Sequence, residues 1–349
     1  MRLAKLLCAL LLCALALPRI SMAEGLKLPA RSDEYSAELA KWVLPLATGH
    51  TKDATASLLS AEGFEVLAQE NFEKAADDPS HTCAYTIAKK EIELDGQTRP
   101  MLLVIVRGTQ AGEWYSNFDF APSHSGDTAF AENFLFAAED VFLGLKGYID
   151  AETNPLVRVS GHSRGAACAN LLGRLLNARY GSESVYAYTF ATPTTVRGEV
   201  EACPNVFNLI NPCDPVTMMP LAAWGYARVG ADIVLKNDES LAARVREGVG
   251  VLAALAPDIP SYYGLKHSLT KAGKDENGLT SFEMMLMIAR GLAGTAGATD
   301  MNTAGAGAIS AESDFAPLLE IVSRLSGGWA DNEVLRQHLP QTYLALLNE

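Results

Sequence analysis

The stretch with the clearest chemical potential is GHSRG at residues 161–165, which sets a serine between two glycines. A β-branched run over residues 156–160 precedes it, and an Ala- and Leu-rich run with helical spacing follows. Strand, G-x-S-x-G and helix together are the context of a nucleophile elbow, a sharp turn that exposes a serine hydroxyl. Glycines leave room for so tight a turn. We therefore predict that Ser163 is a nucleophile; a surface serine in a Gly-rich turn is the alternative.

Two backbone amides are candidates for binding an oxyanion formed at Ser163. Arg164 follows the serine directly, so its N–H belongs to the predicted turn. Thr109 follows an apolar strand predicted over residues 101–106 and offers both an N–H and a hydroxyl. Such donors at the end of a central strand can complete an oxyanion hole, and an ordinary strand-ending turn is the alternative.

A serine nucleophile of this kind is followed in sequence by an acid and then by a histidine base. Asp214 lies just past a strand predicted over residues 206–210, which is where the acid belongs. Two histidines follow it, His267 and His338, and the order of the residues fits both. The remaining histidines precede the serine or adjoin it, and these are His50, His81, His124 and His162.

Strands that alternate with helices predict a mainly parallel sheet flanked by helices. The expected strands cover residues 64–67, 83–94, 101–106, 156–160, 185–190 and 206–210. The expected helices are one through residues 35–43 capped by Ser32, one near 54–60, one over 128–150 and one after the elbow. Residues 224–235 are expected to form a strand pair or an extended segment.

The first 23 residues have the pattern of a secretory signal peptide, with Arg2 and Lys5 before an apolar run and a cleavage site near Ala23. The run is short for a membrane span, and no later stretch suits one. We expect a secreted or periplasmic protein without a transmembrane segment. Cleavage takes the net charge from −13 to −16, because three basic and no acidic residues are lost. Such an acidic protein should not bind nucleic acid through a general field.

Four cysteines follow the predicted signal peptide: Cys83, Cys168, Cys203 and Cys213. An exported protein can oxidise its thiols. Cys203 and Cys213 flank one short segment, so the sequence predicts a disulfide between them. None of the cysteines has the spacing of a zinc site, and we expect no metal.

The chain divides into four parts in this interpretation. The signal peptide (1–23) is followed by an α/β core at residues 24–235. Residues 236–330 have helical patterns and form a predicted insertion, a cap or lid, which contains a flexible Gly- and Ala-rich loop at 291–307. Residues 331–349 are expected to return to the core with His338.

Several segments in this order resemble the class 3 lipase family of α/β hydrolases. They are VIVRGTQAGEWYSNFDF (104–120), VSGHSRGAACANLLG (159–173), TFATPT (189–194) and NLINPCDPVTMMPL (208–221). The resemblance covers roughly residues 80–235 and a further C-terminal piece. It implies the α/β-hydrolase fold with a helical cap, a Ser-Asp-His triad containing Ser163 and Asp214, and an oxyanion hole at Thr109 and Arg164. A histidine followed within a few residues by a tyrosine is similar to the family's base segment, which favours His338 over His267.

The resemblance implies a serine hydrolase of carboxylic esters, most simply a lipase acting on acylglycerols through an acyl-enzyme. It implies no cofactor. The expected partner is an ester or lipid substrate, with transient contact to a lipid surface. A short-chain carboxylesterase and a catalytically silent binding module on the same scaffold are the alternatives. Arg164 departs from the family, since many fungal members have leucine after the nucleophile.

Overall fold

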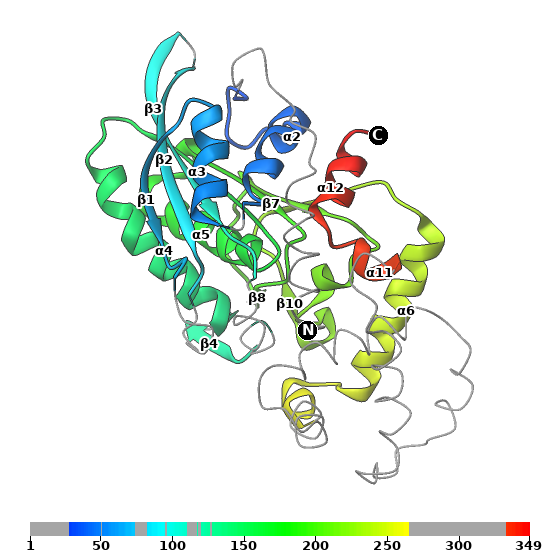
Figure 1. Ribbon diagram of the computed structural model, residues 1–349. Coiled ribbons are helices and arrows are strands. Elements are labelled where there is room, and N and C mark those ends of the chain that lie inside the picture. The colour runs from blue at the N-terminus through cyan, green and yellow to red at the C-terminus, as the bar shows by residue number, and fades with distance from the viewer. Residues whose placement is uncertain are drawn as a thin grey trace.

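The computed structural model describes residues 28–49, 51–73, 82–94, 96–109, 117, 120–125, 128–264 and 333–349 (Figure 1). The predicted signal peptide and most of the predicted 236–330 insertion, including His267 and the 291–307 loop, lie outside these residues. The described part of the chain holds the sheet, its flanking helices and the C-terminal segment.

A seven-stranded sheet forms the centre of the fold, in the order β1-β2-β3-β6-β7-β9-β11. The β1–β2 and β2–β3 pairs are antiparallel, and all later neighbours are parallel. The carboxyl ends of β3, β6, β7 and β9 therefore meet at one edge, as predicted for a mainly parallel sheet. The strands are β1 (Glu65–Glu70), β2 (Tyr85–Leu94), β3 (Gln97–Val106), β6 (Leu156–His162), β7 (Val185–Phe190), β9 (Val206–Ile210) and β11 (Ala231–Val234).

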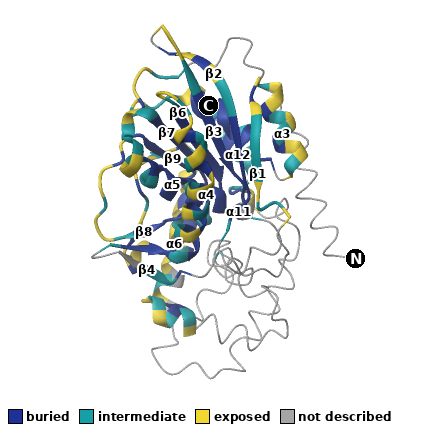
Figure 2. Cartoon of the chain, turned by 90° about the vertical axis from the view of Figure 1, so that its left-hand side faces the viewer, coloured by how far each residue is buried: buried dark blue, intermediate teal, exposed yellow. Residues whose placement is uncertain are grey.

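Helices cover both faces of this sheet, because its central strands are apolar on both sides. Along β3, Leu102 and Val104 pack into one buried cluster with α4 (Glu132–Asp150) and α5 (Arg164–Tyr180). The alternate residues Leu103 and Ile105 pack into a second cluster with α2 (Ala37–Leu46), α3 (Lys52–Ala61) and α12 (Pro340–Leu347). The central strands are accordingly dark in Figure 2. The expected three layers, helix, sheet and helix, are confirmed.

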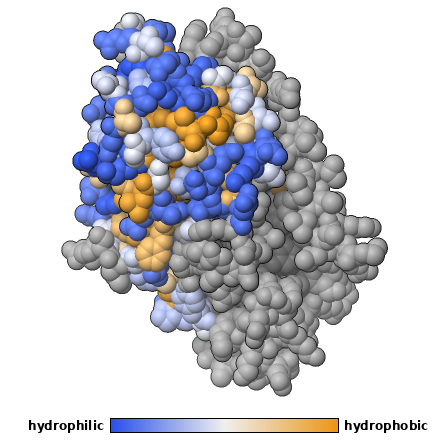
Figure 3. Space-filling view, turned by 60° about the vertical axis from the view of Figure 1, so that its left-hand side comes forward, coloured by the Kyte–Doolittle hydropathy of each residue, from blue (hydrophilic) through white to orange (hydrophobic). Residues whose placement is uncertain are grey.

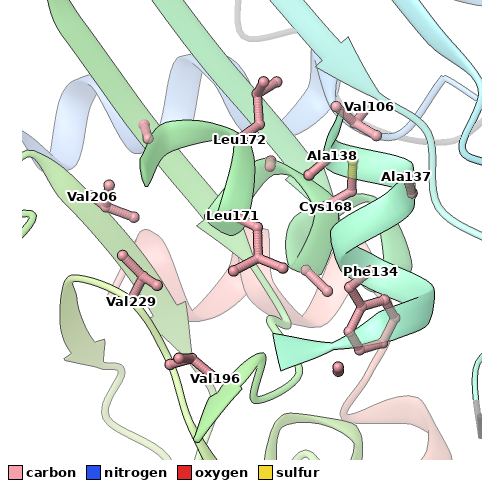
Figure 4. Close-up of a cluster of buried hydrophobic side chains, with 14 of the residues drawn as sticks. Val106, Phe134, Ala137, Ala138, Cys168, Leu171, Leu172, Val196, Val206 and Val229 are labelled. Carbon is pink, nitrogen blue, oxygen red and sulfur yellow. The ribbon is translucent and has the colours of Figure 1, made fainter. Parts of the chain in front are cut away.

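Small side chains let α4 and α5 lie close together and close to the sheet. Figure 4 shows Ala137 and Ala138 of α4 beside Cys168 of α5, with Leu171 of α5 in the same buried cluster. All four side chains are buried. This packing fixes the position of α5, whose first residue follows the candidate nucleophile.

A second, antiparallel sheet in the order β10-β8-β5-β4 was not predicted. It consists of β4 (Pro122–Ser125), β5 (Thr128–Ala131), β8 (Val196–Arg197) and β10 (Tyr226–Ala227). Residues 128–131, which the sequence assigned to a helix, pair with β4 and β8 instead. The helix begins only at Glu132, because Ala131 is extended and donates its N–H to Thr195. Long apolar patterns cannot reveal such a sheet-to-helix junction.

The N-terminal helix also begins later than predicted. Its cap is Ser36, whose hydroxyl accepts the N–H of Leu39 at 3.2 Å. Ser32, the predicted cap, donates its hydroxyl to the carbonyl of Ser182 at 2.8 Å and so ties this segment to the loop before β7. Both serines suit a helix start in sequence, and long-range contacts decide between them.

Short elements connect the sheet to the C-terminal part of the chain. They are the 3-10 turns Pro215–Met218 and Ala222–Trp224 and the helices α6 (Glu239–Leu255) and α11 (Glu333–Arg336), whereas the 3-10 turn Ser182–Ser184 joins α5 to β7. Trp224 donates its indole N–H to the carbonyl of Ala256 at 2.7 Å, which holds the end of α6 against the core. Residues 224–235, expected to be a strand pair or extended, contribute β10 and β11 to different sheets.

The predicted disulfide is wrong, because Cys203 and Cys213 are both free thiols. Cys203 precedes β9 and Cys213 follows it, so the nine residues between them include the five of β9, which extend by about 3.3 Å each. Disulfides require Cα atoms within about 7 Å. The Cys213 thiol lies 3.3 Å from the carbonyl oxygen of Asp238, and burial raises its pKa to about 11. The two cysteines are close in sequence but are kept apart by the extended strand between them.

The described outer surface is mostly hydrophilic in the view of Figure 3, with smaller hydrophobic areas between charged side chains. Within the described ranges, the large exposed hydrophobic side chains are Phe136, Leu143 and Val234. No helix in those ranges is both long and apolar enough to cross a membrane.

Candidate active site

A tight turn joins β6 to α5 and carries Ser163. The serine has φ 60° and ψ −126°, a positive-φ conformation that non-glycine residues rarely adopt and that costs about 1–3 kcal/mol. Its N–H donates to the carbonyl of Phe190 in the neighbouring strand at 3.0 Å, which helps to hold the turn. The nucleophile elbow expected from the sequence is thus present as a backbone conformation.

The two glycines of the motif are required by close backbone packing. A Cβ atom at Gly161 would lie 2.3 Å from the carbonyl oxygen of Gly165. A Cβ atom at Gly165 would lie 2.3 Å from the carbonyl oxygen of Val106, at the end of β3. Any side chain at either position would therefore push the serine turn away from the sheet.

His338 lies between Ser163 and Asp214, although 175 and 124 residues separate it from them in sequence. Its Nε2 is 2.8 Å from the Ser163 hydroxyl oxygen, and its Nδ1 is 2.8 Å from Oδ2 of Asp214. A carboxylate only accepts hydrogen bonds, so Nδ1 carries the proton and Nε2 accepts the hydrogen bond of the Ser163 hydroxyl. The structure brings these three sequence-predicted residues into one hydrogen-bonded row.

The Asp214 carboxylate is fully buried and accepts three hydrogen bonds. Its Oδ1 accepts the N–H of Val216 at 3.0 Å, and its Oδ2 accepts the Tyr343 hydroxyl at 2.8 Å besides His338. Tyr343 in turn accepts the N–H of Asn211 at 3.2 Å. Burial raises the pKa of Tyr343 well above its usual value, and the Asp214 charge raises it further, so the hydroxyl stays a donor.

The loop that carries His338 is held on two sides. Asn211 donates its side-chain amide to the carbonyl of Gln337 at 2.9 Å, which links the loop of Asp214 to the loop of His338. His162 has its Nε2 3.0 Å from the carbonyl oxygen of His338, and the two rings are 5.1 Å apart. The side chain of His162 thus bonds to the backbone of His338 and not to Ser163. A carbonyl only accepts, so His162 is protonated at Nε2.

The predicted oxyanion residues lie on both sides of the serine turn. A Cβ atom at Gly108 would be 3.9 Å from the Ser163 Cβ, so the segment that leads to Thr109 runs beside the elbow. Arg164 is the first residue of α5, where a helix makes no use of the N–H. Both residues therefore flank Ser163 from different elements.

The Arg164 side chain turns into the protein and contacts the same region. It is buried, and its Nη1 donates to Oδ1 of Asn117 at 3.0 Å. Asn117 donates through Nδ2 to the Thr109 hydroxyl oxygen at 2.8 Å. The Arg164 guanidinium also lies 6.0 Å from the Phe134 ring.

The sequence did not predict that Asn117 and Asn211 support the site. It also did not predict the contacts of Tyr343 with Asp214 and of His162 with His338. The only sequence signal was their closeness to motifs, as Asn211 stands three residues before Asp214 and Tyr343 five after His338. In the described ranges, no three His, Cys, Asp or Glu side chains are grouped to hold a metal ion.

Residues 103–224 match the family model described as lipase (class 3). This segment contains the elbow, Asp214 and both oxyanion candidates. No curated protein matches the chain.

Solved structures of fungal proteins are similar over more than half of the chain. A lipase from Rhizopus microsporus var. chinensis is 19% identical, with a TM-score of 0.46, over 64% of this chain and 82% of its own. A mutant form of MDLA from Penicillium cyclopium is 19% identical, with a TM-score of 0.46, over 59% and 82%. Rhizomucor miehei triacylglyceride lipase is 17% identical, with a TM-score of 0.42, over 58% and 81%.

Proposed function

We propose that this chain is a lipase-type carboxylic ester hydrolase with Ser163, Asp214 and His338 as its catalytic triad. The match of residues 103–224 to the class 3 lipase model supports the class of reaction. The observation that carries the proposal is the pair of 2.8 Å distances from the two His338 ring nitrogens to Ser163 and Asp214. Ester hydrolysis by a serine nucleophile needs a base in direct contact with the serine and a third group that orients this base.

His338 Nε2 takes the proton from the Ser163 hydroxyl as its oxygen attacks the ester carbonyl carbon. Asp214 keeps the imidazole in the tautomer with Nδ1 protonated and stabilises the imidazolium that forms. The tetrahedral intermediate collapses, the C–O bond to the alcohol breaks, and the imidazolium protonates the departing alkoxide. Water then attacks the acyl-enzyme through the same base and releases the acid.

Thr109 and Arg164 are proposed to bind the oxyanion of the tetrahedral intermediate through their backbone N–H groups, and Thr109 adds its hydroxyl. Their positions on either side of Ser163 support this role. One such donor typically contributes about 3 kcal/mol to lowering the barrier.

Acylglycerols are the proposed substrates, with transient contact to a lipid surface, on the strength of the family match. We further propose that the protein is exported to the periplasm or the medium after cleavage near Ala23. Sequencing the N-terminus of the protein recovered from its natural host tests the export proposal, and a start at Met1 contradicts it.

The experiment for the activity is hydrolysis of p-nitrophenyl esters of graded chain length and of emulsified triacylglycerol. We expect turnover on long chains, and a fall of about 10⁴-fold or more in kcat for Ser163→Ala and for His338→Ala. Turnover confined to short chains would favour a carboxylesterase. No Ser163-dependent turnover on any ester would favour a binding module.

His267→Ala is the matched control for the base. We expect this variant to retain activity, since His338 contacts both Ser163 and Asp214. Full activity in His338→Ala together with loss in His267→Ala would overturn the assignment of the base.

A further inference from the structure

Three polar side chains beside the serine turn form a row of hydrogen bonds from the interior of the protein to Thr109. Arg164 Nη1 donates to Asn117 Oδ1 at 3.0 Å, and Asn117 Nδ2 donates to the Thr109 hydroxyl oxygen at 2.8 Å. The guanidinium is anchored at its inner end, where Nη2 lies 3.4 Å from the carbonyl oxygen of Thr82. The Arg164 side chain is almost completely buried.

The direction of this row is fixed by the chemistry of its first member. An arginine side chain only donates hydrogen bonds, so the atom of Asn117 that faces it must be the amide oxygen. The amide NH₂ of Asn117 then faces Thr109, and it too can only donate. The Thr109 oxygen must therefore accept this bond, and its own proton has to point elsewhere.

We propose that Arg164, through Asn117, orients the Thr109 hydroxyl so that its proton is presented to the oxyanion. The inference rests on the proposed function, in which Thr109 belongs to the oxyanion hole. Arg164 then supports the hole twice, with its backbone N–H as a donor and with its side chain as a positioning group. A hydroxyl with a preset donor direction requires no reorientation when charge develops in the transition state.

Asn117→Asp tests the direction of the row. Aspartate keeps an oxygen for Arg164, but its second oxygen can only accept, so it draws the Thr109 proton toward itself and away from the oxyanion. We expect kcat on a p-nitrophenyl ester to fall about 10- to 100-fold, with KM within about threefold of wild type. Asn117→Ala removes the donor to the Thr109 hydroxyl without drawing its proton away from the oxyanion, so we expect a smaller loss of kcat.

A purely structural role of Asn117 predicts the opposite order. Alanine would then be worse, because it loses both hydrogen bonds, whereas aspartate retains the bond to Arg164. Equal or higher kcat in Asn117→Asp than in Asn117→Ala would thus overturn the inference.

Thr109→Val shows whether the effect passes through the hydroxyl. In this background we expect Asn117→Asp to change kcat by less than about threefold, since the group that it misdirects is gone. A loss as large as in the wild-type background would indicate a direct charge effect and contradict the inference.

Asn154→Asp is a matched control, because Asn154 also accepts a bond from an arginine, Arg99 Nη2, at 2.9 Å on an exposed part of the protein. It adds the same charge before β6, at the strand end opposite Ser163, and should leave kcat unchanged. Absence of Ser163-dependent turnover in the wild type would overturn the proposed function as well. Wild-type turnover with an unaffected Asn117→Asp variant would overturn only this inference.

Discussion

At the scale of single residues, the Asp214 carboxylate organises the candidate site. It is fully buried, and a buried charge is tolerated only where hydrogen bonds replace water. His338, Tyr343 and the Val216 N–H supply three such bonds. Tyr343 therefore helps to hold the Asp214 carboxylate, which in turn holds the His338 ring.

Tyr343→Phe should lower kcat about tenfold, because Oδ2 of Asp214 loses a donor and holds His338 less firmly. The free energy of unfolding should fall by about 1–2 kcal/mol, since the N–H of Asn211 also loses its acceptor. Steady-state kinetics and urea unfolding measure the two effects.

Tyr186→Phe is the matched control. Tyr186 is buried in the same cluster and donates to the carbonyl of Pro29 at 3.2 Å. Removal of the Tyr186 hydroxyl should lower the free energy of unfolding by about as much as Tyr343→Phe does, and kcat should stay unchanged. Equal effects of both substitutions on kcat would contradict a role of Tyr343 in the site.

At the scale of elements, the junction of β6 and α5 sets the serine against the end of β3. Gly165 allows the first turn of α5 to approach the carbonyl of Val106, and Gly108 allows the segment after β3 to pass beside the elbow. Ser163 and the Thr109 segment are therefore positioned by the same close contact between two strands and a helix.

Gly165→Ala should destabilise the protein by about 3 kcal/mol or more, because its methyl group would meet backbone atoms that cannot rotate away. Activity should fall with it, as the elbow shifts. Thermal unfolding and kcat on a p-nitrophenyl ester measure this.

Gly147→Ala is the control within α4. A Cβ atom there meets nothing within 4 Å, and alanine favours the helix by up to about 1 kcal/mol. Equal stability changes in the two variants would show that the elbow has more room than the backbone distances indicate.

Much of the sheet could be predicted from sequence, because fully buried parallel strands are short, continuous apolar runs. The strands at 185–190 and 206–210 agree with β7 and β9 residue for residue. The small sheet could not be predicted, because β5 and β8 have four and two residues and depend on partners distant in sequence. The start of the N-terminal helix was predicted wrongly for a similar reason, since Ser32 and Ser36 both suit a helix cap and differ in their tertiary contacts.

The site divides in the same way. Ser163 and Asp214 lie in local motifs, and their neighbourhoods could be recognised in sequence. Asn117 could not, since its two partners are 8 and 47 residues away and no local pattern joins them. The unpaired state of Cys203 and Cys213 also depends on β9, whose length separates them.

At the scale of the whole molecule, the C-terminal segment closes the fold. Helix α12 packs into the buried cluster that contains α2 and one face of the central sheet, and Figure 1 shows the two helices near each other. Leu344 and Tyr343 are both buried in that cluster. The residue that contacts Ser163 is thus held by the same packing that joins the two ends of the described chain.

Leu344→Ala should cost about 2–5 kcal/mol in the free energy of unfolding, since it leaves a cavity between α12 and the sheet. Leu346, two residues on, is only partly buried, and Leu346→Ala should cost clearly less. Urea denaturation of both variants makes the comparison. Equal costs would mean that α12 is not seated in the cluster as described.

The distance in sequence between the acid and the base has a consequence for biosynthesis. Translation supplies Ser163 and Asp214 first, and 124 more residues pass before His338 is added. A nascent chain, or a copy ended early by a premature stop codon, lacks the imidazole that the other two residues contact. If the triad acts as proposed, the cell that makes this protein is exposed to its ester-cleaving chemistry only through copies translated past His338.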